Sequence, residues 1–264
     1  MEINTDVQKR IEAFRQDINK HNPEKYVTLN SGSVIDRNSI YVAVVLAYND
    51  AKRTLSGIGK SEEKKNKKDT AISCIVEKLY EYFSNPVSDF EKVHDDLCSI
   101  WCNMFDGSDL DKYGKAQKII NMTFKYLFCC KDAQKDYLDY FENCHMTLDS
   151  YTLAWYKRKD NQDKKDYTWS KLGEKDYKKI QKNIREYLAN DNSFTISIPD
   201  LGSFPSKGLP KQPFLAEFII WEGEKIFESY KTLVKGIKAY KNSPTKDSWL
   251  IGDSFSDFVK NSVN

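Results

Sequence analysis

Apolar residues recur every three or four positions through most of this chain, and this spacing limits its fold more than any other feature. Five of them in the first twenty residues have the spacing of one helix face: Ile3, Val7, Ile11, Phe14 and Ile18. The alternation typical of a strand occurs only at residues 194–198, where it is weak. The sequence therefore predicts an all-α fold. Further helices are expected at residues 39–55, 69–83, 88–105, 115–130, 133–141, 150–156, 174–188 and 214–240.

Two segments break this helical pattern. Residues 56–68 are rich in lysine, and residues 190–213 hold several prolines and two glycines. Both are typical of loops, because proline and glycine interrupt helices and charged runs stay solvated. Pro213 ends the second segment and suits the first position of the helix that follows.

The composition is that of a globular chain. Of its 264 residues, 40% are hydrophobic, so the chain can bury a core without disulfides or a metal. We therefore expect residues 1–264 to form a single globular unit, and we expect a monomer. No 18-residue stretch is free of charge, so no membrane span is predicted. The N-terminus has neither a basic nor an apolar leader, so we expect a cytoplasmic protein.

The formal net charge of +2 conceals an uneven distribution of charge. Residues 81–111 are strongly acidic, whereas residues 60–68, 157–165 and 171–185 are basic. Such asymmetry can hide a phosphate-binding face, although solvated helix faces explain it equally well. If the partner is a nucleic acid, we expect the acidic stretch to be turned away from it.

The cysteines indicate neither disulfides nor a metal site. The six, at positions 74, 98, 102, 129, 130 and 144, include no pair spaced as CxxC and are expected to be reduced. His94, Cys98 and Cys102 follow one helix face, but ligands spread over two turns cannot all reach one zinc ion. A buried stripe is the favoured interpretation, so we expect no metal and no cofactor.

Two helix starts carry residues suited to chemistry. Gly114 and Lys115 open the apolar helix that also carries Lys118, and free backbone N–H groups beside two cations suit a phosphate. Asp149 precedes the apolar helix at residues 150–156, a position at which N-capping alone would explain an acid. Neither feature is specific by itself.

In combination, these residues resemble the helix-hairpin-helix DNA glycosylase superfamily. The chain is most similar to the archaeal 8-oxoguanine DNA glycosylases and to related bacterial glycosylase-like proteins. In that family, a lysine opening an apolar helix and an aspartate at a later helix start form the catalytic pair. The matching residues here are Lys118 and Asp149.

A second match lies near the C-terminus. Pro213, Glu217 and Trp221 resemble the family's helix with a proline, an acid and a tryptophan, whose acid and indole contact the flipped base. Glu217 and Trp221 are four residues apart and share one helix face, beside Phe218. A core tryptophan with an acid near the helix start is the alternative. Trp169 is a further aromatic candidate for the base site.

The resemblance spans residues 85–225 and implies a two-lobed helical helix-hairpin-helix fold with a cleft between the lobes. Residues 1–84 and 226–264 are then expected to pack on this glycosylase-like core. The glycine-rich hairpin of most members is missing, and residues 106–114 stand in its place.

The resemblance also implies a partner, double-stranded DNA containing a modified base. Its phosphates would be bound by Gly114, Lys115 and Lys171. The base is left open: it is oxidised guanine, which suggests repair, or another modified base, including those of phage DNA, which suggests antiviral defence.

The chemistry of the pair follows from the reaction. Cleavage of an N-glycosidic bond builds positive charge on the sugar, which a buried carboxylate such as Asp149 stabilises. An amine attacks C1′ only when it is neutral, a state that apolar neighbours favour for Lys118. If Lys118 stays charged, Asp149 would instead activate water. Lys115 is the rival nucleophile, and an exposed lysine in the first turn is the structural alternative.

Two other classes of protein remain open. Arg15 and His21 satisfy the short arginine–histidine pattern of HEPN-type ribonucleases, in which the histidine acts on a 2′-hydroxyl. The pattern is short, and chance matches are common. A non-catalytic helical interaction protein is the third class. Changing Asp149 to asparagine separates these hypotheses, because only a glycosylase should lose base-excising activity.

Overall fold

The computed structural model describes residues 3–32, 34–55, 57–87, 89–129, 137–160, 165–195, 197–198, 202–203 and 207–241. The described part is all-helical apart from two pairs of two-residue strands, as the periodicity predicts. Parts of the segments discussed above lie outside it: Ser88 and residues 133–136 at the starts of two predicted helices, Cys130, Pro199 and Pro205 of the segment 190–213, and residues 242–264. No helix in the described part is long and apolar enough to cross a membrane.

The helices follow the predicted order, with boundaries that differ by a few residues in most cases. The α-helices are α1 (Thr5–His21), α2 (Pro23–Leu29), α3 (Arg37–Ala51), α4 (Glu62–Ser84), α5 (Phe90–Met104), α6 (Tyr113–Phe128), α8 (Leu138–Phe141), α9 (Ser150–Lys159), α10 (Glu174–Asn190) and α11 (Pro213–Lys241). Short 3₁₀ helices are η1 (Lys52–Thr54), η2 (Ile58–Lys60), η3 (Asp109–Asp111) and η4 (Trp169–Lys171).

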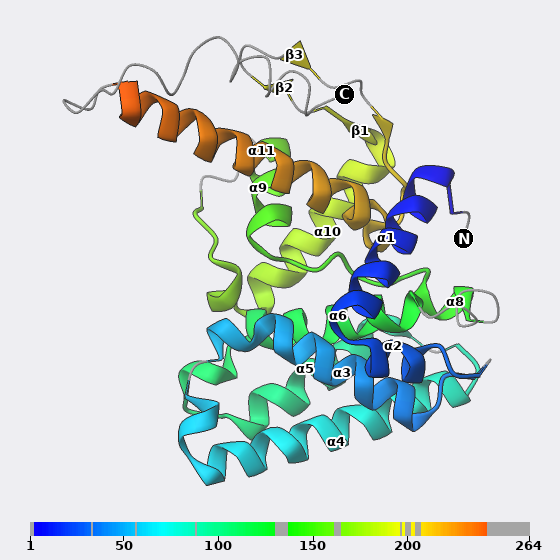
Figure 1. Ribbon diagram of the computed structural model, residues 1–264. Coiled ribbons are helices and arrows are strands. Elements are labelled where there is room, and N and C mark those ends of the chain that lie inside the picture. Colours follow the sequence, from blue (N-terminus) through cyan, green and yellow to red (C-terminus); the bar gives the residue numbers. More distant parts are fainter. Residues whose placement is uncertain are drawn as a thin grey trace.

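Helix α6 lies in the middle of the molecule. Figure 1 shows α3, α4 and α5 on one side of it and α9, α10 and α11 on the other. The buried apolar side chains form one continuous cluster that runs from Val7 in α1 to Ile220 in α11. The helices before residue 85 therefore share one core with the helices α5 to α11 of the described residues.

All sixteen residues of α6 are buried, including three lysines. Burial of a charge is costly unless an opposite charge is close, and each lysine has such a partner. Lys115 pairs with Asp109 (2.6 Å), Lys118 with Asp149 (3.1 Å) and Lys125 with Glu217 (2.8 Å). Two of these acids come from later parts of the chain, so α6 ties its surroundings together through charge as well as apolar packing.

The lysine-rich segment differs from its prediction as a loop. Helix α4 begins at Glu62, so much of this segment is helical. Ser61 caps the helix, and Glu62 and Glu63 lie in its first turn, where the helix dipole favours acids. Glu–Lys pairs three and four residues apart, such as Lys67 with Glu63 (2.9 Å), add support. Capping and Glu–Lys pairs therefore stabilise the first turns of α4, where few apolar residues follow the helical spacing.

Three other local predictions need correction. Helix α5 starts at Phe90, and its N-cap is Asp89, which accepts from the N–H groups of Glu91 and Lys92. Helix α2 was not predicted; it is short and begins with a proline in its first turn. The weak strand signal corresponds to parts of two tiny antiparallel pairs, β1 (Ser193–Phe194) with β4 (Lys207–Gly208) and β2 (Ser197–Ile198) with β3 (Gly202–Ser203).

Candidate functional site

A pocket of about 500 Å³ opens between α1, the end of α3, α6, the start of α9, η4 and α11. This volume lies within the range of roughly 300 to 1,000 Å³ that is usual for small-molecule sites. The pocket brings together six residues that the sequence singled out, from four separate segments: Lys118, Asp149, Trp169, Glu217, Phe218 and Trp221.

Lys118 and Asp149 are in direct contact at one wall of this pocket. Lys118 Nζ lies 3.1 Å from Asp149 Oδ2, and each side chain is 11% exposed. Asp149 is also the N-cap of α9, as predicted: its Oδ1 accepts from the N–H groups of Tyr151 (3.0 Å) and Thr152 (3.1 Å). Capping and ion pairing are therefore compatible, because Oδ1 accepts the capping hydrogen bonds and Oδ2 contacts the Lys118 ammonium.

The surroundings of Asp149 keep it ionised. Burial alone would raise the pKa of this carboxyl. The charge of Lys118, the backbone N–H of Thr152 and the indole of Trp221 outweigh burial and lower the pKa below its usual value. The pocket thus holds a desolvated negative charge at neutral pH.

Trp221 acts on Asp149 directly. Its indole Nε1 donates to Asp149 Oδ2 (3.0 Å), while Tyr151 packs edge-on against its ring at 5.3 Å. The ammonium of Lys225 lies 5.0 Å from the ring centroid. The polar edge of this indole thus holds the carboxylate in place, and the contact with a base that the resemblance implies for Trp221 stays a prediction.

Glu217 is placed differently from its predicted base-reading role. It is 1% exposed, and both carboxylate oxygens are engaged within the protein. Oε1 accepts from Lys125 Nζ (2.8 Å) and Oε2 from the backbone N–H of Thr147 (2.7 Å). Phe218 lies beneath the same ammonium, 4.5 Å from ring centroid to Nζ. Glu217 therefore anchors the segment that leads into Asp149.

Trp169 is an aromatic side chain placed where it can meet a ligand. It is half-buried, lines the pocket and lies 5.7 Å from Lys118 Nζ to its ring centroid. Planar aromatic surface next to a charged pair is what a flat, polar-edged ligand needs.

The phosphate site expected at the start of α6 is not open. The N–H of Gly114 donates to the carbonyl of Leu172 (2.9 Å), and Lys115 Nζ bonds both the carbonyl and the side chain of Asp109. Neither residue lines the pocket, so Lys115 also lacks the contact with Asp149 that a rival nucleophile needs. Lys171 is exposed in η4, two residues beyond Trp169.

The glycine at position 114 serves packing, and its substitution should be severe. A Cβ on Gly114 would lie 1.8 Å from the carbonyl oxygen of Trp169. We expect Gly114→Ala to lower the free energy of unfolding by about 3 kcal/mol, because α6 and η4 must separate. Urea denaturation measures the change.

Gly59→Ala is the matched control, since no atom lies within 4 Å of a Cβ at that position. Its effect on stability should be within about 0.5 kcal/mol. Equal stability of the two variants would show that α6 and η4 do not meet as closely as described.

Helices that precede the predicted core supply groups that the sequence did not reveal. Asp50, at the end of α3, accepts from Tyr126 (2.9 Å) and lines the pocket with Arg53 of η1. In the described part of the chain, neither Arg53 nor Lys225 forms an ion pair with an acid. The sequence did not point to Asp50 or Arg53. Contacts between distant segments bring their side chains to the pocket, and no pattern in the neighbouring residues indicates such contacts.

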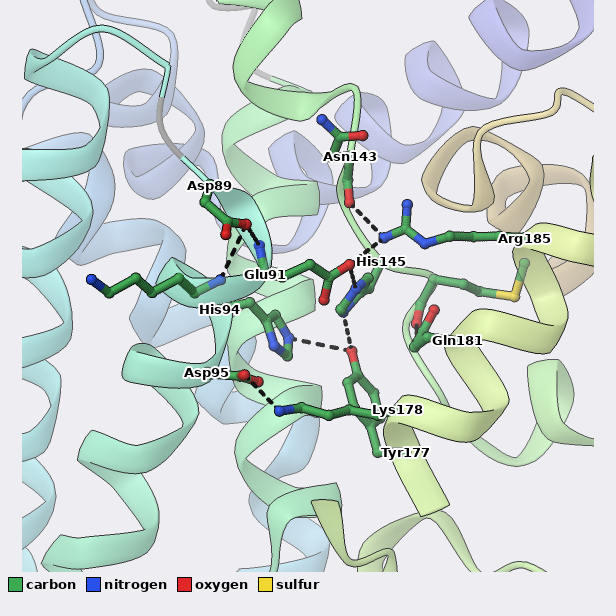
Figure 2. A network of polar contacts seen from close by, with 12 residues as sticks. Asp89, Glu91, His94, Asp95, Asn143, His145, Tyr177, Lys178, Gln181 and Arg185 are labelled. Carbon is green, nitrogen blue, oxygen red and sulfur yellow. Dashed lines mark hydrogen bonds and ion pairs between the residues drawn. The ribbon is translucent and has the colours of Figure 1, made fainter. Parts of the chain in front are cut away.

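A second polar network lies away from the pocket, between α5 and α10 (Figure 2). His94 Nε2 donates to Asn121 (3.0 Å) and its ring stacks on Tyr177, with centroids 5.4 Å apart. His145 Nε2 donates to Glu91 (2.9 Å), and its Nδ1 accepts from the Tyr177 hydroxyl (2.8 Å). Because His145 lies four residues before Asp149, this network also supports the segment that leads into Asp149.

This network bears on two sequence interpretations. No three histidine, cysteine or acidic side chains gather as metal ligands within the described residues, and His94 is hydrogen-bonded in the core. The basic stretch at residues 171–185 was expected to be available for phosphates, but two of its cations pair with the acidic stretch: Lys178 with Asp95 (2.6 Å) and Arg185 with Glu91 (2.9 Å). Figure 2 shows both ion pairs. Ion pairs between the acidic and the basic stretch therefore join α5 to α10.

The arginine–histidine pattern does not converge on a site. Arg15 is buried and its guanidinium donates to the carbonyl of Cys129 in the core. His21 is exposed at the end of α1, where its Nδ1 lies 3.0 Å from the carbonyl of Asp17. The two side chains are engaged in different surroundings, so this arrangement gives no support to ribonuclease chemistry.

No protein-family model matches the chain, and neither a curated protein nor a solved structure matches it.

Proposed function

We propose that this protein is a DNA glycosylase that flips a modified base out of double-stranded DNA and cleaves its N-glycosidic bond. The observation that carries the proposal is the Lys118–Asp149 pair, held in an aromatic-lined pocket with the carboxylate ionised. Lys118 lies on α6 and Asp149 precedes α9, so the two residues are far apart in the sequence. They are also the two residues that match the catalytic pair of the family that the chain resembles. The helices on either side of α6 would form the two lobes, and the DNA would lie across the mouth of the pocket between them.

The pocket has the parts that the reaction needs. An extruded base would enter beside Trp169, with its sugar C1′ near Asp149 and Lys118. As the bond from C1′ to the base nitrogen breaks, its electron pair leaves with the base and positive charge develops on the sugar. The Asp149 carboxylate stabilises that charge, and its hydrogen bonds from Trp221, Tyr151 and Thr152 keep it in place.

Two nucleophiles can complete the step. Lys118 forms a bond from Nζ to C1′ once it has given up a proton to water in the pocket, so that Asp149, whose Oδ2 lies 3.1 Å from Nζ, stays ionised. A water molecule in the same position gives hydrolysis without a covalent intermediate. We favour the lysine route because its amine is already held in the pocket.

The DNA backbone would be held by exposed cations around the pocket. Arg53 and Lys225 line it without an acidic partner in the described residues, and Lys171 lies near Trp169. Contacts between cations and phosphates weaken with salt, so binding of duplex DNA should fall steeply as ionic strength rises.

A panel of duplexes tests the function directly. Each would carry one modified base, including 8-oxoguanine and the modified bases of phage DNA, and abasic-site formation would be measured. Release of at least one base by the wild-type protein is the expected result. If none is released while the duplexes are bound, the protein is a DNA-binding or scaffold protein and the proposal fails.

Trapping with borohydride identifies the nucleophile. A Schiff base between Lys118 and C1′ would be reduced to a stable protein–DNA adduct, which we expect with the wild-type protein and not with Lys118→Gln. Gel mobility of the denatured adduct provides the measurement. If the wild-type protein releases the base but forms no adduct, water is the nucleophile. If the adduct is lost only in Lys115→Gln, Lys115 and not Lys118 is the nucleophile.

A further inference from the structure

A second carboxyl shares the pocket, and its surroundings contrast with those of Asp149. Asp149 receives three hydrogen bonds from N–H donors and one from the Lys118 ammonium. Asp50 receives one hydrogen bond, from the Tyr126 hydroxyl to Oδ2. The Oδ1 atom of Asp50 has no hydrogen-bond partner among the described residues, so it is free to meet a ligand.

The charged and titratable neighbours of Asp50 come from three elements. Lys118, Lys125 and Tyr126 lie on α6, Asp17 lies on α1, and Arg53 follows α3. Desolvation by the surrounding protein raises the pKa of Asp50. The hydrogen bond from Tyr126 and the charges of the two lysines offset this only in part, and the charge of Asp17 adds to it.

Asp50 is also accessible from the pocket. As a residue Asp50 is exposed, unlike Asp149, although protein atoms surround much of its carboxyl, and a base that fills the pocket would cover it. Displacement of water by an uncharged base disfavours the carboxylate form further. Two carboxyls in one site, one kept ionised and the other favoured as the acid, are the arrangement by which enzymes divide electrostatic and proton-donating roles.

We propose that Asp50 donates the proton to the departing base. This inference rests on the proposed glycosylase function and adds a residue to it that lies outside the region of family resemblance. When the bond from C1′ to the base nitrogen breaks, the base takes the electron pair, and the proton of Asp50 Oδ1 moves to a ring nitrogen or carbonyl oxygen of the base. The nucleophile loses one proton as it bonds to C1′, so protons balance, and Asp50 is reprotonated from solvent.

The proposal predicts that the effect of Asp50→Asn depends on the leaving base. Neutral 8-oxoguanine needs the proton, so its single-turnover release should fall by roughly 100-fold, the scale of general acid catalysis. 7-Methylguanine carries a fixed positive charge and leaves without protonation, so its release should change by less than about threefold. Affinity for both duplexes, measured by anisotropy, should be retained.

The pH profile gives a second readout. Catalysis requires the protonated acid, so release of 8-oxoguanine by the wild-type protein should decline as pH rises through the raised pKa of Asp50. In Asp50→Asn that decline should be absent. Asp89→Asn is the matched control: Asp89 lies at the start of α5, outside the pocket lining, so this variant should keep both the wild-type profile and the base dependence.

The outcomes separate this inference from the function on which it rests. If the wild-type protein releases neither base, the glycosylase proposal fails for these bases and the inference falls with it. If the wild-type protein is active and Asp50→Asn keeps its rate and pH profile, only the role of Asp50 is overturned. If release of both bases falls equally, Asp50 shapes the pocket and is not the proton donor.

Discussion

Asp149→Asn is expected to lower the single-turnover rate of base release by about 10³-fold while leaving the fold intact. The substitution removes the charge that would stabilise the sugar cation. The fold should survive because asparagine is as good an N-cap as aspartate, so the N–H groups of Tyr151 and Thr152 keep an acceptor. Lys118 lines the open pocket, so water can reach its ammonium once the carboxylate is gone. The rate should be measured under saturating protein, with thermal unfolding measured in parallel.

The control is the same substitution at another capping position. Asp89 caps α5 through Glu91 and Lys92 and lies outside the pocket lining, so Asp89→Asn should leave base release unchanged. If Asp149→Asn kept more than about a tenth of the wild-type rate at normal stability, the carboxylate would be a cap and nothing more.

The parts of this site that the sequence predicted are those marked by local patterns. Asp149 could be placed at a helix start because an acid precedes an apolar run there, and α9 begins at the next residue. The contact between Lys118 and Asp149 was implied by resemblance and not by spacing, and the structure brings the two atoms to 3.1 Å. The chemistry of the pair stays a prediction.

The parts that sequence did not predict depend on contacts between distant segments. Asp50 and Arg53 reach the pocket only because α3 packs against α6, which no pattern around residue 50 reveals. Glycine at 114 looked suited to phosphate, whereas its lack of a Cβ lets η4 approach. An amphipathic periodicity also cannot distinguish a half-exposed helix from α6, which is buried on every side.

Glu217→Ala is expected to destabilise the protein by roughly 3 to 5 kcal/mol, because it leaves the ammonium of Lys125 buried without its partner. The side chains of Glu217 and Lys125 are 2% and 7% exposed, so water cannot replace the lost carboxylate. The backbone N–H of Thr147 would lose its acceptor as well. Chemical denaturation with a two-state fit measures the change.

A double variant distinguishes a structural role of Glu217 from recognition of the base. In Lys125→Met with Glu217→Gln, no charge is left buried, the glutamine oxygen can still accept from Thr147, and methionine fills the space of the lysine stem. We expect this variant to regain most of the lost stability and to release the base within about tenfold of the wild-type rate, because Asp149 is still held by α9 and Trp221. A stable double variant that binds duplex DNA but no longer discriminates between bases would instead show that Glu217 reads the base.

Full stability of Glu217→Ala would mean that the ion pair with Lys125 is not formed in solution. The segment that leads into Asp149 would then be held in place by other contacts.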